Sequence, residues 1–387
     1  MLYSVRFMTK LFPLLIIVFI FSVIILLFLQ RSYLKSSNAI PSKEYLVNLF
    51  DNLDRQVNHG KGYSEFANNK GFPTGAILAW SESYLLQSYA NMYIATKQEK
   101  YLIKMKDQIH SILNNRDDKI GRVYDGNLLP VWGSDRYNKD EKWQHYAVHT
   151  GMIVYPMLEF VFIVKQNNLL EFADDSKVFL SDGLESIDFY SKYWENDHYF
   201  STDGSVLPAN QQAALGRCLI MLFKITGEKQ YFEKSVKLAG FLKDNALKEI
   251  EGRIVIIDNL KSTRKIKGSD ISHAAITAHF IYLAHKNNIV FNDDDDLCNL
   301  SNTLRDLGIQ NDGRFPFYLD GRGKFDCEVS VGQLFFLTEF DKSLENLMLG
   351  LYFEHLKIDQ TAKYFQEDWW GESMLGLSSM TRYLYSN

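Results

Sequence analysis

Two long segments of the chain share one arrangement of hydrophobic and polar positions. In residues 85–113 and again in residues 214–242, apolar side chains recur every three or four positions, which predicts helices with one buried face. A short polar stretch interrupts each segment, at 96–98 in the first and at 226–228 in the second. Both segments are therefore predicted to be helical hairpins, made of a helix, a tight turn and a second helix.

The hairpin recurs along the chain. The spacing of successive first helices is about 60 residues and shortens to about 40 near the end. Their predicted starts lie near Trp80, His149, Ala213, Ser272, Glu328 and Trp370. Longer loops rich in glycine and aromatic residues separate the hairpins. The first helix of the sixth hairpin lacks a full partner after it in the sequence. We therefore expect the amphipathic segment 45–57 to pack against it and close a ring from the other end of the chain.

Six helical hairpins with long loops on one side resemble the (α/α)6 toroid of six-hairpin glycosidases, polysaccharide lyases and uronyl epimerases. The local pattern that carries the resemblance best is Leu215 to Tyr231, with its Thr-Gly turn and following tyrosine. The resemblance covers residues 44–387 and implies an all-α domain. It also implies that the inner helices point their N-terminal ends at a shared carbohydrate-binding cleft. An α-solenoid interaction scaffold is the alternative fold.

The N-terminal segment differs from the rest of the chain. Residues 11–29 are apolar and uncharged, which is about the length that crosses a bilayer. We expect a short cytoplasmic tail at 1–10, a single transmembrane helix at 11–30, a connector at 31–43 and the toroid domain at 44–387. The main domain is then expected on the periplasmic or extracytoplasmic side. A cleaved signal segment is the alternative, although the apolar run is long for one.

Composition narrows the possible partners. The chain has 387 residues, of which 46% are hydrophobic, and its 42 basic and 47 acidic residues give a net charge of −5. No basic excess is available to bind nucleic acid. The 3 cysteines do not form a disulfide framework, and no Cys/His spacing resembles a zinc site. We expect no metal and no cofactor.

The predicted helix starts carry more histidine, tyrosine, tryptophan and charge than helix capping requires. If the ring closes, these side chains meet at one site. The candidate catalytic residues are His273, His149, His145, Tyr146, Asp270, Glu328 and Tyr318. The candidate substrate-binding residues are Trp80, Trp143, Asn210, Gln211, Gln212, Arg314, Arg322, Trp369, Trp370 and Glu372.

Asp270 and His273 form the leading candidate pair. A carboxylate three positions before an imidazole can orient it as a general base. Asp270 can equally serve as a plain helix cap. His279 lies six residues further along and points about 240° away on a regular helix, so we expect it to be structural.

The other candidates have simpler alternatives. His145 and His149 are expected to share one helix face, where they contact substrate or are buried with hydrogen-bond partners. Their spacing also suits a metal, but the HExxH pattern is absent. The amides at 210–212 either cap a helix or donate to sugar hydroxyls. Segment 365–374 either supplies stacking aromatics or plugs the ring.

The expected function is a membrane-anchored enzyme that acts on an exported, acidic polysaccharide. Removal of the proton at C5 of a uronate needs a base, an acid and a group that neutralises the carboxylate. The histidines, tyrosines and arginines at the helix starts fit a lyase or uronate epimerase better than a glycoside hydrolase. A hydrolase, which needs a carboxyl pair, is the second possibility. A glycan-binding or assembly scaffold without catalysis is the third.

Overall fold

A computed structural model describes residues 40–64, 74–137, 142–260, 266–310, 315–323, 328–359 and 370–386. The chain divides into two units, Met1–Ser42 and Lys43–Asn387. The second unit begins one residue before the predicted start of the toroid domain. The expected transmembrane helix at 11–30 lies outside the described residues.

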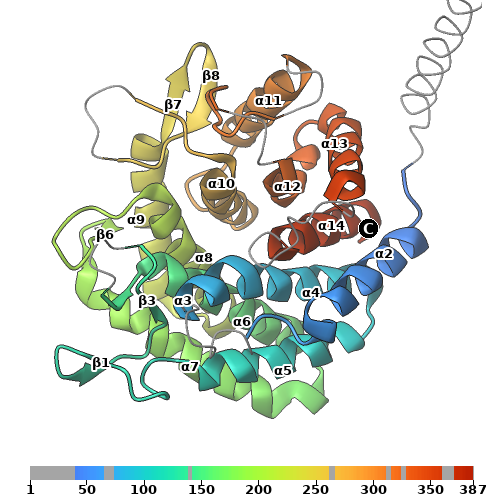
Figure 1. Cartoon of the computed structure of the whole chain (residues 1–387). Helices are drawn as coiled ribbons and strands as arrows, with labels where there is room; N and C mark the ends of the chain where they lie inside the picture. The colour runs from blue at the N-terminus through green and yellow to red at the C-terminus, as the bar shows by residue number, and fades with distance from the viewer. Residues whose placement is uncertain are drawn as a thin grey trace, which may run out of the picture. The chain divides into compact units, whose positions relative to one another are not determined.

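Unit Lys43–Asn387 is built mainly from helices arranged in an inner and an outer layer (Figure 1). The inner segments, in chain order, are α4 (Ser83–Thr96), α6 (Ala147–Asn167), α8 (Ala209–Thr226), α10 (Ile271–Lys286), α12 (Glu328–Val331) with η6 (Gly332–Glu339), and α14 (Trp370–Tyr385). The outer helices are α5 (Lys100–Asn114), α7 (Ala173–Asp188), α9 (Lys229–Ala246), α11 (Asp295–Gln310), α13 (Ser343–Asp359) and α2 (Lys43–Gln56). Each inner segment packs against the next, and α14 packs against α4, so the inner layer closes into a ring.

The two hairpins read most clearly from the sequence have the same turn. Thr96 and Thr226 each accept the N–H of the residue two positions later and donate to a carbonyl one helical turn back. Lys97 and Gly227 follow in the left-handed conformation, with φ of 60° and 76°. Glycine adopts this conformation without strain, and lysine does so at a small cost. The predicted turn at 96–98 and the predicted turn at 226–228 are both confirmed.

The ring closes through segment 45–57, as predicted. Helix α2 packs against the outer side of α14 and supplies the partner that α14 lacks in sequence order. On the inner side, α14 approaches the first hairpin closely at Gly371. A Cβ atom at this position would lie 2.3 Å from the carbonyl oxygen of Ser81, which is far inside van der Waals contact. Glycine is required here because two backbones touch.

Short elements fill the connections between the long helices. They include α3 (Thr74–Ile77), the π-helical turn η3 (Leu78–Glu82), and the 3₁₀ turns η1 (Asn58–Gly60), η4 (Leu170–Phe172) and η5 (Phe189–Tyr193). Four antiparallel two-stranded ribbons complete the described part: β1 (Val123–Tyr124) with β2 (Asn127–Leu128), β3 (Gly133–Ser134) with β4 (Gln144–His145), β5 (Trp194–Glu195) with β6 (His198–Tyr199), and β7 (Leu247–Ile250) with β8 (Arg253–Ile256). In the longest ribbon Leu247 pairs with Ile256 and Ile250 with Arg253.

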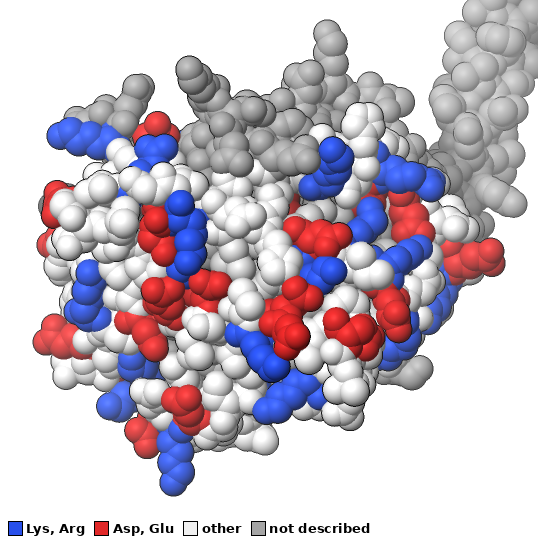
Figure 2. Space-filling view, turned by 90° about the horizontal axis from the view of Figure 1, so that it is seen from below, with Lys and Arg blue, Asp and Glu red and all other residues white. Residues whose placement is uncertain are grey.

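Helix α6 has the length and hydropathy of a membrane span, yet it is a core helix. Within the described residues it is the one helix that meets both criteria, and 89% of its most apolar window is buried. Neighbouring inner helices cover it on both sides, which explains its lack of an amphipathic pattern. On the face seen in Figure 2, acidic and basic side chains are interspersed, without a large area of one sign.

Candidate active site

His273 lies in the first turn of α10 and is held by a carboxylate. Asp270 caps this helix, because its Oδ1 accepts the backbone N–H of His273 at 3.0 Å. Its Oδ2 lies 2.9 Å from Nδ1 of the His273 ring. Burial alone would lower the pKa of His273, but Asp270, Asp258 and Glu372 outweigh burial and raise this pKa above its usual value. Asp270 therefore caps the helix and orients the imidazole at the same time.

Asp258 is a second carboxylate beside the same imidazole. It follows strand β8, and its Oδ2 lies 3.6 Å from Nδ1 of His273. Helix α8 fixes it from the other side: the N–H of Asn210 donates to Oδ1 at 2.9 Å, and the N–H of Ala209 donates to its backbone carbonyl at 3.0 Å. Burial raises the pKa of Asp258, and the charge of His273 opposes this rise. The third and fourth hairpins thus meet at Asp258.

Trp80 joins the first hairpin to this group. It lies in the π-helical turn η3, a kind of turn that is frequent at functional sites. The centroid of its ring is 6.1 Å from that of His149 and 6.0 Å from that of His273. Since both imidazoles contact one indole, the starts of the first, second and fourth inner segments lie together.

His149 lies in the first turn of α6 and is fully buried. Its ring centroid is 5.0 Å from that of Tyr146 and 5.7 Å from that of Tyr137. Within the described residues, neither ring nitrogen makes a hydrogen bond of normal geometry. Burial lowers the pKa of His149 to about 3, and a weak interaction with the backbone of Trp132 opposes this only in part. His149 is therefore neutral at neutral pH.

Glu372 connects the fifth and sixth hairpins to the groups around His273. It lies in the first turn of α14, is 7% exposed, and accepts a hydrogen bond from Ser330 Oγ. Burial raises the pKa of Glu372 to about 7; Ser330 and His273 oppose the rise, and the charge of Asp270 adds to it. We call the following residues the entrance cluster: Trp80, Tyr146, His149, Asp258, Asp270, His273 and Glu372.

Tyr318 lies next to the entrance cluster. The N–H of Ile271 donates to the Phe317 carbonyl at 3.0 Å, and this pairing places Tyr318 opposite Asp270. Arg322 lies over the Tyr318 ring, with its guanidinium carbon 5.1 Å from the centroid. The Arg322 Nε donates to Asp320 Oδ2 at 2.9 Å, and a second nitrogen pairs with the same carboxylate. The charge of Arg322 is thus neutralised by Asp320.

The prediction that His145 and His149 share one helix face is wrong. His145 lies in strand β4, and α6 begins only at Ala147 because Tyr146 is extended. The His145 ring instead contacts Phe189 and Tyr190, with centroids 5.2 Å and 5.9 Å away. Burial lowers the pKa of His145 to about 4, and the charge of nearby Lys192 adds to the fall.

Trp143 and Gln212 serve the structure of loops. Trp143 Nε1 donates to Asp117 at 3.1 Å, and the guanidinium carbon of Arg122 lies 3.7 Å from the Trp143 ring centroid. Gln212 is buried, and its amide accepts from the N–H of Tyr199 at 2.9 Å and donates to the carbonyl of Tyr199 at 2.8 Å. The substrate-donor interpretation of Gln212 is wrong, because its side chain holds the loop before α8.

The remaining candidates fall into two groups. Asn210 is buried beside Asp258, and its side-chain oxygen has no hydrogen-bond partner among the described residues, whereas Gln211 is half-buried in the first turn of α8. Glu328 and Trp370 begin α12 and α14 as predicted, but their side chains, like all of Arg314 and Trp369, lie outside the described residues.

Two residues near the histidines were missed from the sequence. Asp258 stands fifteen positions before His273, outside any predicted helix start, and only the fold of the β7–β8 ribbon brings it to α10. Tyr137 lies in a long loop, where helical periodicity carries no information. The available signal for Asp258 was the strand-like run Arg253–Ile256, which an acidic residue follows two positions later.

Three groups of the entrance cluster have pKa values that are displaced from their ordinary values. His273 has a raised pKa, His149 has a strongly lowered one, and Glu372 titrates near neutrality. Such pairs of opposite displacement mark acid and base roles in active sites. In the described part of the chain, no group of three His, Cys, Asp or Glu side chains is arranged to hold a metal ion.

Comparison with known proteins identifies the fold. No family model and no curated protein matches the chain. Among solved structures, a polysaccharide lyase is 11% identical, and the match covers 88% of this chain and 98% of the lyase, with a TM-score of 0.55. The cellobiose 2-epimerase from Spirochaeta thermophila is 11% identical, with 87% and 97% covered and a TM-score of 0.54.

A third match is an inactive variant of the α-1,6-mannanase of Salegentibacter sp. in complex with α-1,6-mannotetrose. It is 13% identical, with 88% of this chain and 99% of that chain covered and a TM-score of 0.51. These proteins are (α/α)6 toroids, so the chain has the toroid fold of six-hairpin glycosidase-like proteins, and the predicted fold is confirmed. All three neighbours are carbohydrate-active enzymes.

Proposed function

We propose that this chain is a carbohydrate-active enzyme that moves a proton at a sugar carbon next to a carbonyl or carboxyl group. Epimerases, isomerases and lyases share that step. One observation carries the proposal: His273 and His149 contact the same Trp80 ring, and their pKa values are displaced in opposite directions. At neutral pH His273 holds a proton more readily than usual and can take up and return one, whereas His149 is neutral.

Trp80 provides the surface for the sugar in this proposal. An indole face packs against the C–H face of a pyranose and places that face between the two imidazoles. Asp270 fixes the tautomer of His273 through Nδ1, which leaves Nε2 to exchange a proton with substrate. His273 is the more accessible imidazole, with 37% of its side chain exposed. We therefore assign it the first contact with substrate, and His149 the opposite side.

The charges around His273 favour a neutral sugar. The expectation of an acidic polysaccharide rested on Arg314 and Arg322 together with the amides at 210–212. Arg322 is engaged by Asp320, and Gln212 by the loop before α8. Asp258, Asp270 and Glu372 place three carboxyl groups around His273. A further carboxylate from a uronate would meet this negative charge, so neutral oligosaccharides and their reducing ends are the first substrates to test.

Glycoside hydrolysis is the second candidate, and Glu372 supports it. A buried carboxyl group with a pKa near 7 suits a general acid, and Asp258 or Asp270 would then be the partner carboxylate. In this mechanism the histidines only position the substrate.

A panel of substrates separates the candidates. The full chain in detergent would be incubated with cellobiose, mannan oligosaccharides and uronate polymers. An isomeric sugar without cleavage indicates an epimerase or isomerase, an unsaturated product a lyase, and two saturated fragments a hydrolase. His273→Ala should abolish the reaction. His110→Gln is the matched control, since His110 also pairs with an aspartate, Asp175, on the outer layer. No turnover of any substrate by wild type would favour the scaffold instead.

Anchoring by residues 11–30, with the toroid domain exported, is a separate part of the proposal. Its support is the uncharged apolar run in the sequence. Carbonate extraction of membranes, together with protease treatment of intact and permeabilised spheroplasts, tests it. Release of the protein by carbonate would contradict anchoring, and protection inside intact spheroplasts would contradict export.

A further inference from the structure

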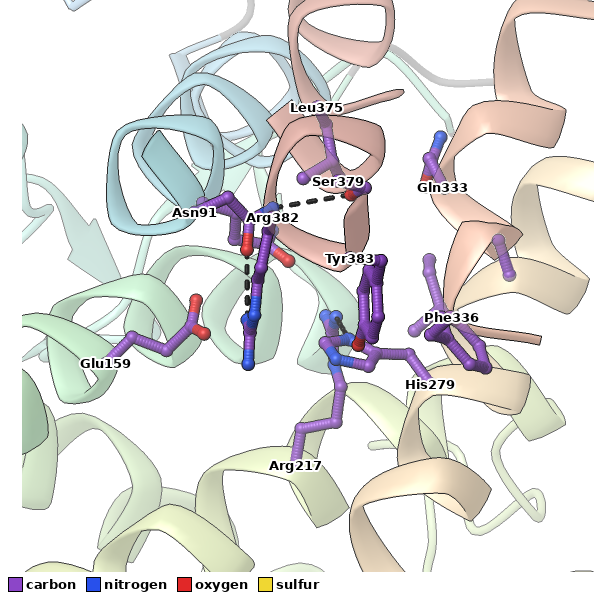
Figure 3. Close-up of a pocket in the computed structure, with 13 residues that line it drawn as sticks. Asn91, Glu159, Arg217, His279, Gln333, Phe336, Leu375, Ser379, Arg382 and Tyr383 are labelled. Atoms are coloured by element: carbon purple, nitrogen blue, oxygen red, sulfur yellow. Dashed lines mark hydrogen bonds between the residues drawn. The ribbon is translucent and has the colours of Figure 1, made fainter. Parts of the chain in front are cut away.

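A cavity of about 30 Å³ lies inside the ring, apart from the entrance cluster. All the inner helices line it, but with residues from deeper turns: His279 is six positions beyond His273 on α10, and Arg382 is ten positions beyond Glu372 on α14. A buried water needs about 10–15 Å³ of such space, so the cavity has room for about two waters or one small ion. Figure 3 shows its polar lining.

Arg217 is the most unusual group in this lining. It is 2% exposed and comes from the middle of α8. Its Nη1 lies 3.3 Å from Nδ1 of His279, and its Nη2 lies 2.8 Å from the sulfur of Met152. Its Nε has no hydrogen-bond partner, and none of the described carboxylates forms an ion pair with it. A buried guanidinium without a counter-charge costs several kcal/mol.

Arg382 adds a second positive charge to the same cavity. Its Nη1 donates to Asn91 Oδ1 at 2.9 Å, and Figure 3 shows its guanidinium extending towards Glu159. Glu159 is the nearby acid: burial raises its pKa to about 7, although Arg382 and Arg217 oppose the rise. Two permanent positive charges therefore face one carboxyl group that is only partly ionised at neutral pH.

His279 does not balance the positive charges of Arg217 and Arg382. Burial and the charges of Arg217 and Arg382 lower its pKa well below the usual value, so it is neutral. Lys224, on the same inner helix as Arg217, adds more positive charge near Glu159. The lining of the cavity thus has an excess of positive charge. His279, expected from the sequence to be structural, packs against the rings of Tyr155 and Phe336, with centroids 5.5 Å and 5.6 Å away, and also lines this cavity.

We propose that the cavity binds one small inorganic anion of the size of chloride between Arg217 and Arg382. The free Nε of Arg217 supplies a donor, and Asn91 and Ser379 line the same space. The volume excludes sulfate and phosphate with their hydration. The anion links α8 to α14 across the ring and stabilises the inner helices whose first turns carry His273 and Glu372. This site is independent of the proposed function.

Thermal unfolding of the full chain in detergent tests the proposal. Chloride would be varied from 1 to 100 mM, with gluconate keeping the ionic strength constant. For half-saturation near 1 mM, the melting temperature should rise by about 3 °C. Arg217→Met should remove the chloride dependence, and Glu159→Gln should move half-saturation to lower chloride. Arg55→Gln, a change on the exposed side of α2, is the matched control and should keep the wild-type dependence.

A crystal soaked in bromide locates the ion without any variant. The expected result is an anomalous peak between Arg217 and Arg382. Equal melting temperatures in chloride and gluconate, or a bromide-soaked crystal without that peak, would overturn the proposal. So would an equal stabilisation by glucuronate, because that result would assign the cavity to a sugar carboxylate.

Discussion

Asp270→Asn separates the two tasks of Asp270. The amide oxygen of asparagine can still accept the N–H of His273, so the cap of α10 is retained, and asparagine is as good a cap as aspartate. We therefore expect the retained cap to keep its contribution to the free energy of unfolding to within about 1 kcal/mol. The amide cannot hold a positive charge on the imidazole, and its NH₂ group would face Nδ1 at the position where Oδ2 now lies at 2.9 Å.

Two effects on His273 follow. A hydrogen bond to a charged group contributes about 1.5–3 kcal/mol, so the loss of this bond lowers the pKa of His273. The NH₂ group also favours the tautomer with its proton on Nε2, which is wrong for a base at that nitrogen. We expect kcat to fall about 100-fold or more. Asp258, whose Oδ2 is 3.6 Å from Nδ1, replaces part of the lost interaction, so Asp258→Asn/Asp270→Asn should be slower still.

The assay combines kinetics, unfolding and NMR. The ring signal of His273 is assigned by its loss in His273→Ala, and its titration is compared in wild type and Asp270→Asn. Asp270→Ala removes the cap as well and should cost about 1 kcal/mol more in stability. An unchanged titration of His273 in Asp270→Asn, or wild-type kcat, would refute the assignment of Asp270 as the orienting carboxylate.

Three further predictions concern stability. Gln212→Ala should destabilise the fold by about 2–4 kcal/mol, since buried backbone groups of the loop lose their partner, while kcat/KM of the remaining folded protein stays near wild type. Gly371→Ala should lower the melting temperature strongly, because its Cβ would overlap the Ser81 carbonyl; a change below 1 °C would contradict the tight contact. His149 has a folded pKa of about 3 against about 6.5 unfolded, so its contribution is present above pH 6.5 and is lost as the pH falls towards 3. Between pH 7 and pH 4.5 wild type should therefore lose about 2.5 kcal/mol more stability than His149→Phe, as urea unfolding would measure.

The architecture could be read from the sequence because each hairpin is a local unit. The apolar spacing and the Thr-Gly turn define two helices and the chain reversal between them, whatever the other hairpins do. Six successive copies then leave few arrangements other than a ring or a solenoid. The segment 45–57 could be placed because a ring of inner helices leaves α14 without an outer partner.

The site was only partly predictable, because its members meet through loops. Asp270 and His273 were found together, since three positions on one helix start are a local relation. His145 was misplaced because the periodicity of α6 gave no sign that Tyr146 would be extended. Gln212 was misread because hydrogen bonds to a loop thirteen residues earlier cannot be seen in a sequence. Asp258 depends on the pairing of β7 with β8, which is a tertiary relation.

The central claim is that His273 and His149 transfer a proton at a sugar carbon. The most direct measurement is deuterium uptake in heavy water by substrate recovered before full conversion, followed by NMR. We predict deuterium at a single carbon next to the carbonyl or carboxyl group with wild type and with His110→Gln, and none with His273→Ala. Turnover to saturated products without deuterium at any carbon would contradict the claim and would favour hydrolysis through Glu372.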